Sequence, residues 1–132
     1  MTMDDNYLHA KVSSSEDTVY VEVFPGDHLL ASDQDASDLV VLCMEKKVDR
    51  MLIHDGVFAD SFFSLKLGVA GIFLQKFINY SITAAIVIGS HGVRGSAFFD
   101  MAAEANRGEQ IRFFQEEEPA REWITSGSVI PL

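Results

Sequence analysis

The sequence predicts a single α/β domain, with a mainly parallel sheet, helices packed on it, and the element order β-β-α-β-α-β-α-β-α. Short runs of β-branched and apolar residues alternate with longer stretches of helical periodicity. One run, ITAAIVIG at 82–89, is apolar throughout, which is typical of a parallel strand buried on both faces. The 132 residues match the size of one domain, so we treat 1–132 as one unit. We expect an ordered core over about 7–125 and loose termini.

The first third of the chain predicts a hairpin followed by a helix. The two strands are expected at 7–12 and 18–24, and a polar turn is expected between them at 13–17. Ser32 is the expected N-cap of the helix, because Asp35 follows three residues later, as in a capping box. The helix is expected to end at the lysine pair 46–47, where positive charge suits the helix dipole.

We expect the fold to be arranged around SFFSLKLGVAGIFLQKFINY at 61–80, the longest run without an acidic residue. Its apolar residues recur at helical spacing on two sides. The sequence therefore predicts one helix over 61–80, capped by Asp60, that packs against two surfaces. Gly68 and Gly71 each cost about 1 kcal/mol relative to alanine inside a helix. We expect another backbone or a ligand to lie close to both glycines and offset this cost.

The remaining chain continues the alternation of strands and helices. Further strands are expected at 51–53, 82–89 and 111–114, and further helices at 97–106 and 116–124. Arg107 and Gly108 are the expected end of the 97–106 helix. This order places several strand ends next to loops that can carry function.

Composition and charge exclude several classes of protein. The formal net charge is −10 and no basic stripe is present, so we expect no binding to nucleic acid. No apolar window reaches about eighteen residues, so we expect no membrane span. Cys43 is the single cysteine; we expect it to be buried, and the protein to be cytoplasmic. The acidity either supports solubility or selects a basic partner.

The loops after the strands carry the candidate chemistry. His54, Asp55 and His91, with Glu104, could supply acid–base groups, but no spacing fits a metal site or a catalytic triad. We therefore expect no metal and no cofactor. The stretch IGSHGVRGS resembles the start of the phosphate loop of universal stress proteins, with an ordinary turn from Gly89 to Ser96 as the alternative.

Other polar residues have a structural and a functional interpretation each. Ser61 and Asp60 either cap a helix or form an anion or phosphorylation site at its start. Lys66 and Lys76 are expected to extend into solvent, and Lys66 has anion binding as its alternative. A secondary polar cluster either caps a helix or contacts the 61–80 segment or a partner; it comprises Glu104, Asn106 and Arg107.

The element order resembles the STAS domain, the fold of bacterial anti-sigma-factor antagonists, with the best match over 51–124. MLIHDGVFADSFF resembles the third strand of that fold, its loop and the Asp-Ser at the start of a helix. In those antagonists a kinase phosphorylates the serine and thereby controls docking, so the resemblance implies a phosphorylation site at Ser61. This chain departs from the pattern with Phe62 and Phe63, where the antagonists have Ser or Thr and then Gly.

A closer resemblance covers nearly the whole chain. FFSLKLGVAGIFLQKFINY, followed by AIVIG and EANRG, resembles an uncharacterised bacterial family, domain of unknown function 4180. Members often have an acid where Ser61 stands, and the resemblance implies no established activity. The matching positions are Phe62, Phe63, Leu65, Lys66, Gly68, Ala70, Gly71, Leu74, Gln75, Lys76, Phe77, Asn79, Tyr80, Glu104, Asn106, Arg107 and Gly108.

We expect a non-enzymatic regulatory or protein-interaction module. One side of the 61–80 helix would cover the sheet, and the other would contact a protein partner or a second copy of the chain, as in a dimer. The expected interaction residues are Phe62, Phe63, Lys66, Gly68, Gly71, Gln75, Lys76, Asn79 and Tyr80. The alternative is a small-molecule or nucleotide-binding protein, or an enzyme, that uses the loops around His54, Ser61 and Gly89 to Ser96.

Overall fold

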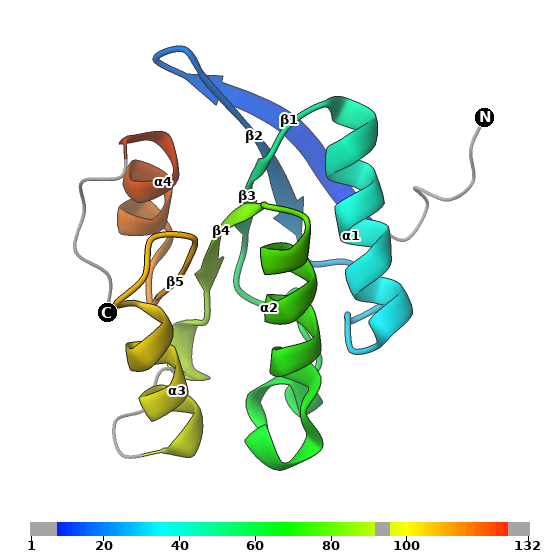
Figure 1. The fold of residues 1–132 in the computed structure, drawn as a ribbon, viewed down its shortest axis with the longest axis vertical. Coiled ribbons are helices and arrows are strands. Elements are labelled where there is room, and N and C mark those ends of the chain that lie inside the picture. Colours follow the sequence, from blue (N-terminus) through cyan, green and yellow to red (C-terminus); the bar gives the residue numbers. More distant parts are fainter. Residues whose placement is uncertain (1–7, 92–95, 127–132) are drawn as a thin grey trace.

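The computed structural model describes residues 8–91 and 96–126, which form one α/β domain (Figure 1). The predicted order of elements is confirmed. The strands are β1 (His9–Ser15), β2 (Thr18–Phe24), β3 (Arg50–Ile53), β4 (Thr83–Val87) and β5 (Ile111–Phe114), and the α-helices of the described residues are α1 (Asp33–Lys46), α2 (Val69–Asn79), α3 (Ala97–Ala105) and α4 (Glu117–Ser126). The termini expected to be loose, and residues 92–95 of the loop after β4, lie outside the described residues.

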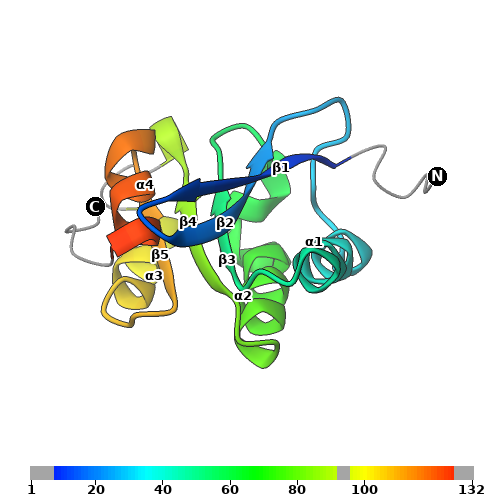
Figure 2. The ribbon, with the colours of Figure 1, turned by 90° about the horizontal axis from the view of Figure 1, so that it is seen from above.

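The strands follow one another across the sheet in chain order, β1-β2-β3-β4-β5. β1 pairs with β2 antiparallel, and the other neighbours are parallel. Connections between parallel strands are right-handed, so this order places α1, α2 and α3 on the same face. α4 follows β5 and packs against the opposite face, where it contacts β2, β3, β4 and β5 (Figure 2).

Each face of the sheet has its own apolar core. The larger core joins the sheet to α1, α2 and α3, through residues such as Val21, Met51 and Ile86. The smaller core joins alternate strand residues to α4, and it comprises Tyr20, Leu52, Ala85, Val87, Phe114, Ala120, Trp123 and Ile124. Cys43 lies in the larger core, as predicted; burial, together with the nearby Asp49, raises the pKa of its thiol to about 12.

The hairpin differs from the predicted one, whereas α1 starts where the sequence predicts. β1 extends to Ser15, and only Glu16 and Asp17 form the turn, so the polar turn predicted at 13–17 is wrong. Both turn residues have positive φ, +49° and +72°, as a two-residue turn between twisted strands requires. At α1 the capping box is confirmed, because Ser32 Oγ accepts from the Asp35 amide and Asp35 Oδ2 accepts from the Ser32 amide.

Segment 61–80 is not one helix, so this prediction is wrong. Two 3-10 turns, at Asp60–Phe63 and Leu65–Leu67, precede α2, which begins at Val69. Gly68 separates them with a φ of +74°, a left-handed conformation that glycine adopts without steric cost. Gly68 is therefore the N-cap of α2 rather than an interior residue. Asp60 caps neither element, because Ala59 occupies the N-cap of the first turn.

The segment is also buried on one side only. Phe62, Ala70, Phe73 and Phe77 lie in the larger core. Its exposed apolar residues are Leu65, Leu67, Ile72, Ile78 and Tyr80. At Gly68 and at Gly71, an added Cβ would meet no atom of the described chain within 4 Å. Within the described chain, nothing covers the second side or approaches either glycine. A close approach by a second chain or a ligand stays a prediction.

Alanine substitutions at these two glycines should change stability in opposite directions. Gly68→Ala places a side chain on a left-handed residue and should lower the free energy of unfolding by about 1–2 kcal/mol. Gly71→Ala removes a flexible residue from a helix with open space above it, and should raise that free energy by about 0.5–1 kcal/mol. Urea unfolding at low protein concentration measures both changes. Equal destabilisation by the two substitutions would contradict the assignment of Gly68 as the N-cap of α2 and of Gly71 as an interior residue.

Candidate functional site

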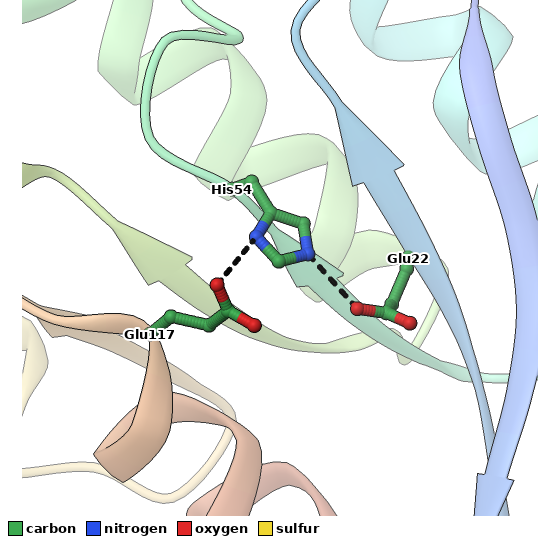
Figure 3. Close-up of side chains that lie close together, drawn as sticks. All are labelled: Glu22, His54 and Glu117. Atoms are coloured by element: carbon green, nitrogen blue, oxygen red, sulfur yellow. Dashed lines mark hydrogen bonds and ion pairs between the residues drawn. The ribbon is translucent and has the colours of Figure 1, made fainter.

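Four charged or ionisable side chains meet between the sheet and α4, and we call them the ionic cluster: Glu22, His54, Glu117 and Arg121. Glu22 lies in β2, and His54 directly follows β3, its parallel neighbour. Both point to the face that α4 covers, because side chains alternate along a strand. Glu117 and Arg121 are four residues apart in α4, so they share the helix side that faces the sheet. Figure 3 shows three of the four residues.

Glu22 is the most buried member of the cluster, with 3% of its surface exposed. Its Oε1 accepts a hydrogen bond from the Ser13 hydroxyl at 2.6 Å, and its Oε2 lies 2.9 Å from His54 Nε2 and 2.9 Å from Arg121 Nη2. Burial alone would raise the pKa of this carboxyl. The hydrogen bonds from Arg121, Ser13 and His54 outweigh burial and lower the pKa from 4.5 to about 2.

Arg121 joins the two carboxylates. Its Nη2 contacts Oε2 of Glu22 and Oε2 of Glu117, and its Nη1 donates to the Tyr20 hydroxyl at 2.8 Å. The hydrogen bond to Glu22 is the main reason why the pKa of Arg121 is raised above its ordinary value. A guanidinium that bridges β2 and the first turns of α4 holds that helix on the sheet.

His54 lies between the two carboxylates, with 9% of its surface exposed. Its Nε2 faces Glu22, and its Nδ1 faces Glu117 Oε1 at 3.7 Å (Figure 3). The Phe24 ring stacks on the imidazole at a centroid distance of 4.5 Å and an angle of 13°. The ring is therefore held on both its edge and its face. Glu22, His54 and Glu117 are also three possible metal ligands brought close together.

The ionic cluster predicts a loss of stability in acid. Because the pKa of Glu22 is about 2 in the folded protein and near 4.5 without these contacts, the unfolded chain binds the proton more strongly. The stabilisation is complete above pH 4.5 and is lost as the pH falls toward 2, by about 3 kcal/mol in total.

Denaturant unfolding of the wild type and of Glu22→Gln, at several pH values between 2 and 6, measures this effect. The difference between their free energies of unfolding should shrink as the pH falls. The comparison also cancels the contribution of Asp35, whose pKa is lowered too: burial opposes that shift, and hydrogen bonds from Ala31, His28 and Ser32 outweigh it. A difference that stays constant with pH would contradict the low pKa of Glu22.

The structure places Ser61 and Asp60 in a short 3-10 turn, eight or more residues before the start of α2. The Asp60 side chain is fully exposed, and its Oδ1 lies 4.0 Å from His91 Nε2. Ser61 is half-buried, and its carbonyl accepts from the Ser64 amide. The predicted position at the N-terminus of a long helix is therefore wrong, while the phosphorylation of Ser61 stays a prediction.

The loops after β3 and β4 come close together at the carboxyl edge of the sheet. A Cβ added at Gly89 would lie only 2.2 Å from Asp55 Oδ2, so the two loops touch there. His91 stacks on Phe63 at a centroid distance of 3.8 Å. His54 instead turns toward α4 and joins the ionic cluster. The last part of the loop, residues 92–95, lies outside the described residues.

The remaining predicted interaction residues divide into core, helix-pairing and exposed positions. Phe62 is fully buried, and Phe63 is half-buried. Lys76 Nζ lies 3.0 Å from Asp33 Oδ1 and 3.1 Å from Ser37 Oγ, so it ties α2 to α1. The exposed members are Lys66, Gly68, Gly71, Gln75, Asn79 and Tyr80, with a hydrogen bond from Gln75 to Asn79.

In the predicted secondary polar cluster, Asn106 has a clear structural role. It is the C-cap of α3, a place that the sequence assigned to Arg107 and Gly108. Its side chain forms two hydrogen bonds with the backbone of Phe113, accepting from the amide at 2.7 Å and donating to the carbonyl at 3.2 Å. Asn106 thus fixes β5 against α3. Glu104 and Arg107 are exposed, and Arg107 Nε lies 3.9 Å from Glu104 Oε1.

Sequence reasoning missed most of the ionic cluster. It identified His54, but not Glu22, Glu117 or Arg121 as its partners. The available signal was an acid between apolar residues in YVEVF, which is costly to bury unless it is paired. Its cation lies 99 residues further along the chain, and no spacing rule connects two such distant positions.

The fold and the site define an α/β protein that has a five-stranded mixed sheet and a buried ionic cluster under its last helix. The chain belongs to the family described as "Domain of unknown function (DUF4180)", which matches residues 15–124. No curated protein matches the chain. No solved structure matches it either, so the resemblance to STAS domains stays a prediction. Among the described residues, no helix has the length and apolar content that a membrane span requires.

Proposed function

We propose that this protein is a cytoplasmic, non-enzymatic regulatory module that associates with a second copy of itself. The contact is the outer face of α2, which we define as Gly71, Ile72, Gln75, Ile78 and Asn79. These residues recur at intervals of three and four, so they form one side of the helix. The observation that carries the proposal is Gly71, a helical glycine with open space where its side chain would be.

The burial pattern supports a contact at this face. All five residues of the outer face are exposed, including 37% of Ile72 and 47% of Ile78. Glycine inside a helix lowers stability by about 0.5–1 kcal/mol relative to alanine, and no atom of the described chain benefits from its small size. The close approach of a second helix backbone would give Gly71 a packing role.

The charge distribution supports a second copy as the occupant. The whole chain has a formal net charge of −10, so most pairs of surfaces on two copies repel each other. Segment 61–80 contains no acidic residue, and one of its two lysines, Lys76, is paired with Asp33. The outer face itself is uncharged. Two copies can therefore meet here, across a two-fold axis, without direct repulsion between like charges.

Sedimentation velocity over a range of protein concentrations tests the proposal. We expect the wild type to form dimers that dissociate on dilution, and Gly71→Leu to remain monomeric because its side chain blocks the contact. An added Cβ at this position meets no other described residue within 4 Å, and leucine favours a helix more than glycine does, so the thermal stability of the variant at low concentration should match or exceed that of the wild type.

Ala103→Leu is the matched control, because it adds an equal side chain at an exposed position of α3. This variant should dimerise like the wild type. A wild-type protein that stays monomeric at millimolar concentration would overturn the proposal. Equal dimerisation of Gly71→Leu and the wild type would also overturn it.

A further inference from the structure

We infer that His54 Nδ1 and Glu117 Oε1 form the protein side of a site for a divalent transition-metal ion, such as Zn²⁺. The site lies where β3 ends, under the first turn of α4 (Figure 3). It is separate from the outer face of α2, and its test does not depend on self-association.

The first step is the position of the proton on the His54 ring. Glu22 Oε1 accepts a hydrogen bond from the Ser13 hydroxyl, and its Oε2 lies 2.9 Å from the Arg121 guanidinium, so this carboxylate acts only as an acceptor here. Its Oε2 lies 2.9 Å from His54 Nε2. Nε2 must therefore carry a hydrogen and donate it to Glu22. This assignment leaves Nδ1 as the ring nitrogen that is able to bind a metal ion in place of a proton.

The second step is what Nδ1 faces. Glu117 Oε1 lies 3.7 Å away, and it too has only electron pairs to offer. No donor among the described residues forms a hydrogen bond with Nδ1. The imidazole, on a side chain that is 11% exposed, thus directs Nδ1 toward a carboxylate oxygen. Two such groups facing each other are stabilised by a cation between them.

The third step is geometry. Zn²⁺ binds histidine nitrogen and carboxylate oxygen at about 2.0–2.2 Å in a tetrahedral arrangement. Two ligand atoms of such an ion lie about 3.4 Å apart by this geometry. Nδ1 and Oε1 are separated by 3.7 Å, so a small rotation of the Glu117 side chain, which is half-exposed, brings them into place. Water would complete the coordination.

The surrounding residues hold both ligands in position. Glu22 accepts from the far nitrogen of His54, which is the usual role of a carboxylate behind a metal-bound histidine. Phe24 fixes the plane of the ring. Arg121 contacts Oε2 of Glu117 and leaves Oε1 available.

The charges and ligand types select the ion. If the imidazole is counted as neutral, the two carboxylates and one guanidinium of the ionic cluster carry a net charge of −1. This net negative charge attracts a cation. The guanidinium weakens the attraction, so we expect a weaker site than one with three or four protein ligands. Imidazole nitrogen suits Zn²⁺ and Co²⁺, whereas Ca²⁺ and Mg²⁺ prefer oxygen ligands.

Calorimetric titration of the untagged full chain with Zn²⁺, and with Mg²⁺ in parallel, tests the inference. We expect one Zn²⁺ per chain and no binding of Mg²⁺. Glu117→Gln should weaken Zn²⁺ binding by about tenfold or more, because mutations around a metal site typically reduce affinity by that factor. This residue is half-exposed, so the variant should fold. In an NMR titration, Zn²⁺ should shift the Nδ1 resonance of His54.

Two matched variants separate this site from chance binding elsewhere. Glu118→Gln changes an exposed neighbour of Glu117, and His91→Ala removes an exposed histidine. Both should bind Zn²⁺ like the wild type. The inference is overturned if millimolar Zn²⁺ produces no heat of binding, if Glu117→Gln binds as tightly as the wild type, or if His91→Ala abolishes binding.

Discussion

Glu22→Gln should lower the free energy of unfolding by about 3–5 kcal/mol at neutral pH. The substitution keeps the size of the side chain but removes the charge that Arg121 and His54 surround. It leaves a guanidinium partly buried beside a neutral amide, whose own N–H groups add donors where acceptors are needed. Because domains are only marginally stable, this loss is a large fraction of the total free energy of unfolding.

Chemical denaturation followed by circular dichroism measures the loss. Glu118→Gln is the matched control, because it makes the same chemical change at an exposed site in the first turn of α4, and it should stay within about 0.5 kcal/mol of the wild type. If Glu22→Gln is as stable as Glu118→Gln, the ionic cluster does not hold α4 on the sheet.

Phe62→Ala should cost about 3–5 kcal/mol of stability. Phe62 has no exposed surface, and its ring stacks on Phe58 at a centroid distance of 3.8 Å. It also contacts the rings of Phe73 and Phe98, so it links the 3-10 turn before α2 to both α2 and α3. Its removal leaves a cavity at the point where these three elements meet.

Phe63→Ala provides the comparison within the same turn. Phe63 is half-buried and stacks on His91, so its loss should cost clearly less than that of Phe62. Unfolding by urea, with the two variants measured side by side, gives the order. An equal or larger cost for Phe63→Ala would show that Phe62 is not the residue that anchors the turn.

The order of elements could be predicted because each one carries a local signal. The continuous apolar run at 82–89 indicated the strand β4, and Ser32 with Asp35 indicated the start of α1. The end of β1 carried no such signal, since the three serines at 13–15 resemble a turn. They are part of the strand because they pair with β2 in register. Tertiary pairing overrides local preference at such positions.

Segment 61–80 shows where a periodic pattern misleads. Its apolar spacing was correct for Ala70 and Phe77, which lie in the larger core. Spacing says nothing about backbone dihedral angles, and a glycine fits a helix interior and a left-handed cap equally well by sequence. The positive φ of Gly68 divides the segment and moves the helix start to Val69. The predicted anion site at Ser61 depended on that earlier start.

The ionic cluster could not be assembled from the sequence because its members are distant along the chain. Side chains alternate along a strand, so Tyr20, Glu22 and Phe24 share one face of β2, but no local signal shows that a helix near the end of the chain covers this face. Packing of α4 covers that face and buries Glu22. The family that matches residues 15–124 is described as one of unknown function, so it assigns no role to the cluster.

Disulfide trapping at Gly71 tests the proposed self-association most directly. Cys43 can stay in place, because it is buried and the pKa of its thiol is raised to about 12, so it does not compete in the reaction. A disulfide requires the two Cα atoms to come within about 7 Å of each other. We predict that Gly71→Cys forms a linked dimer rapidly on mild oxidation, whereas Ala103→Cys stays monomeric. Equally slow cross-linking of both variants would contradict a contact between two copies at the outer face of α2.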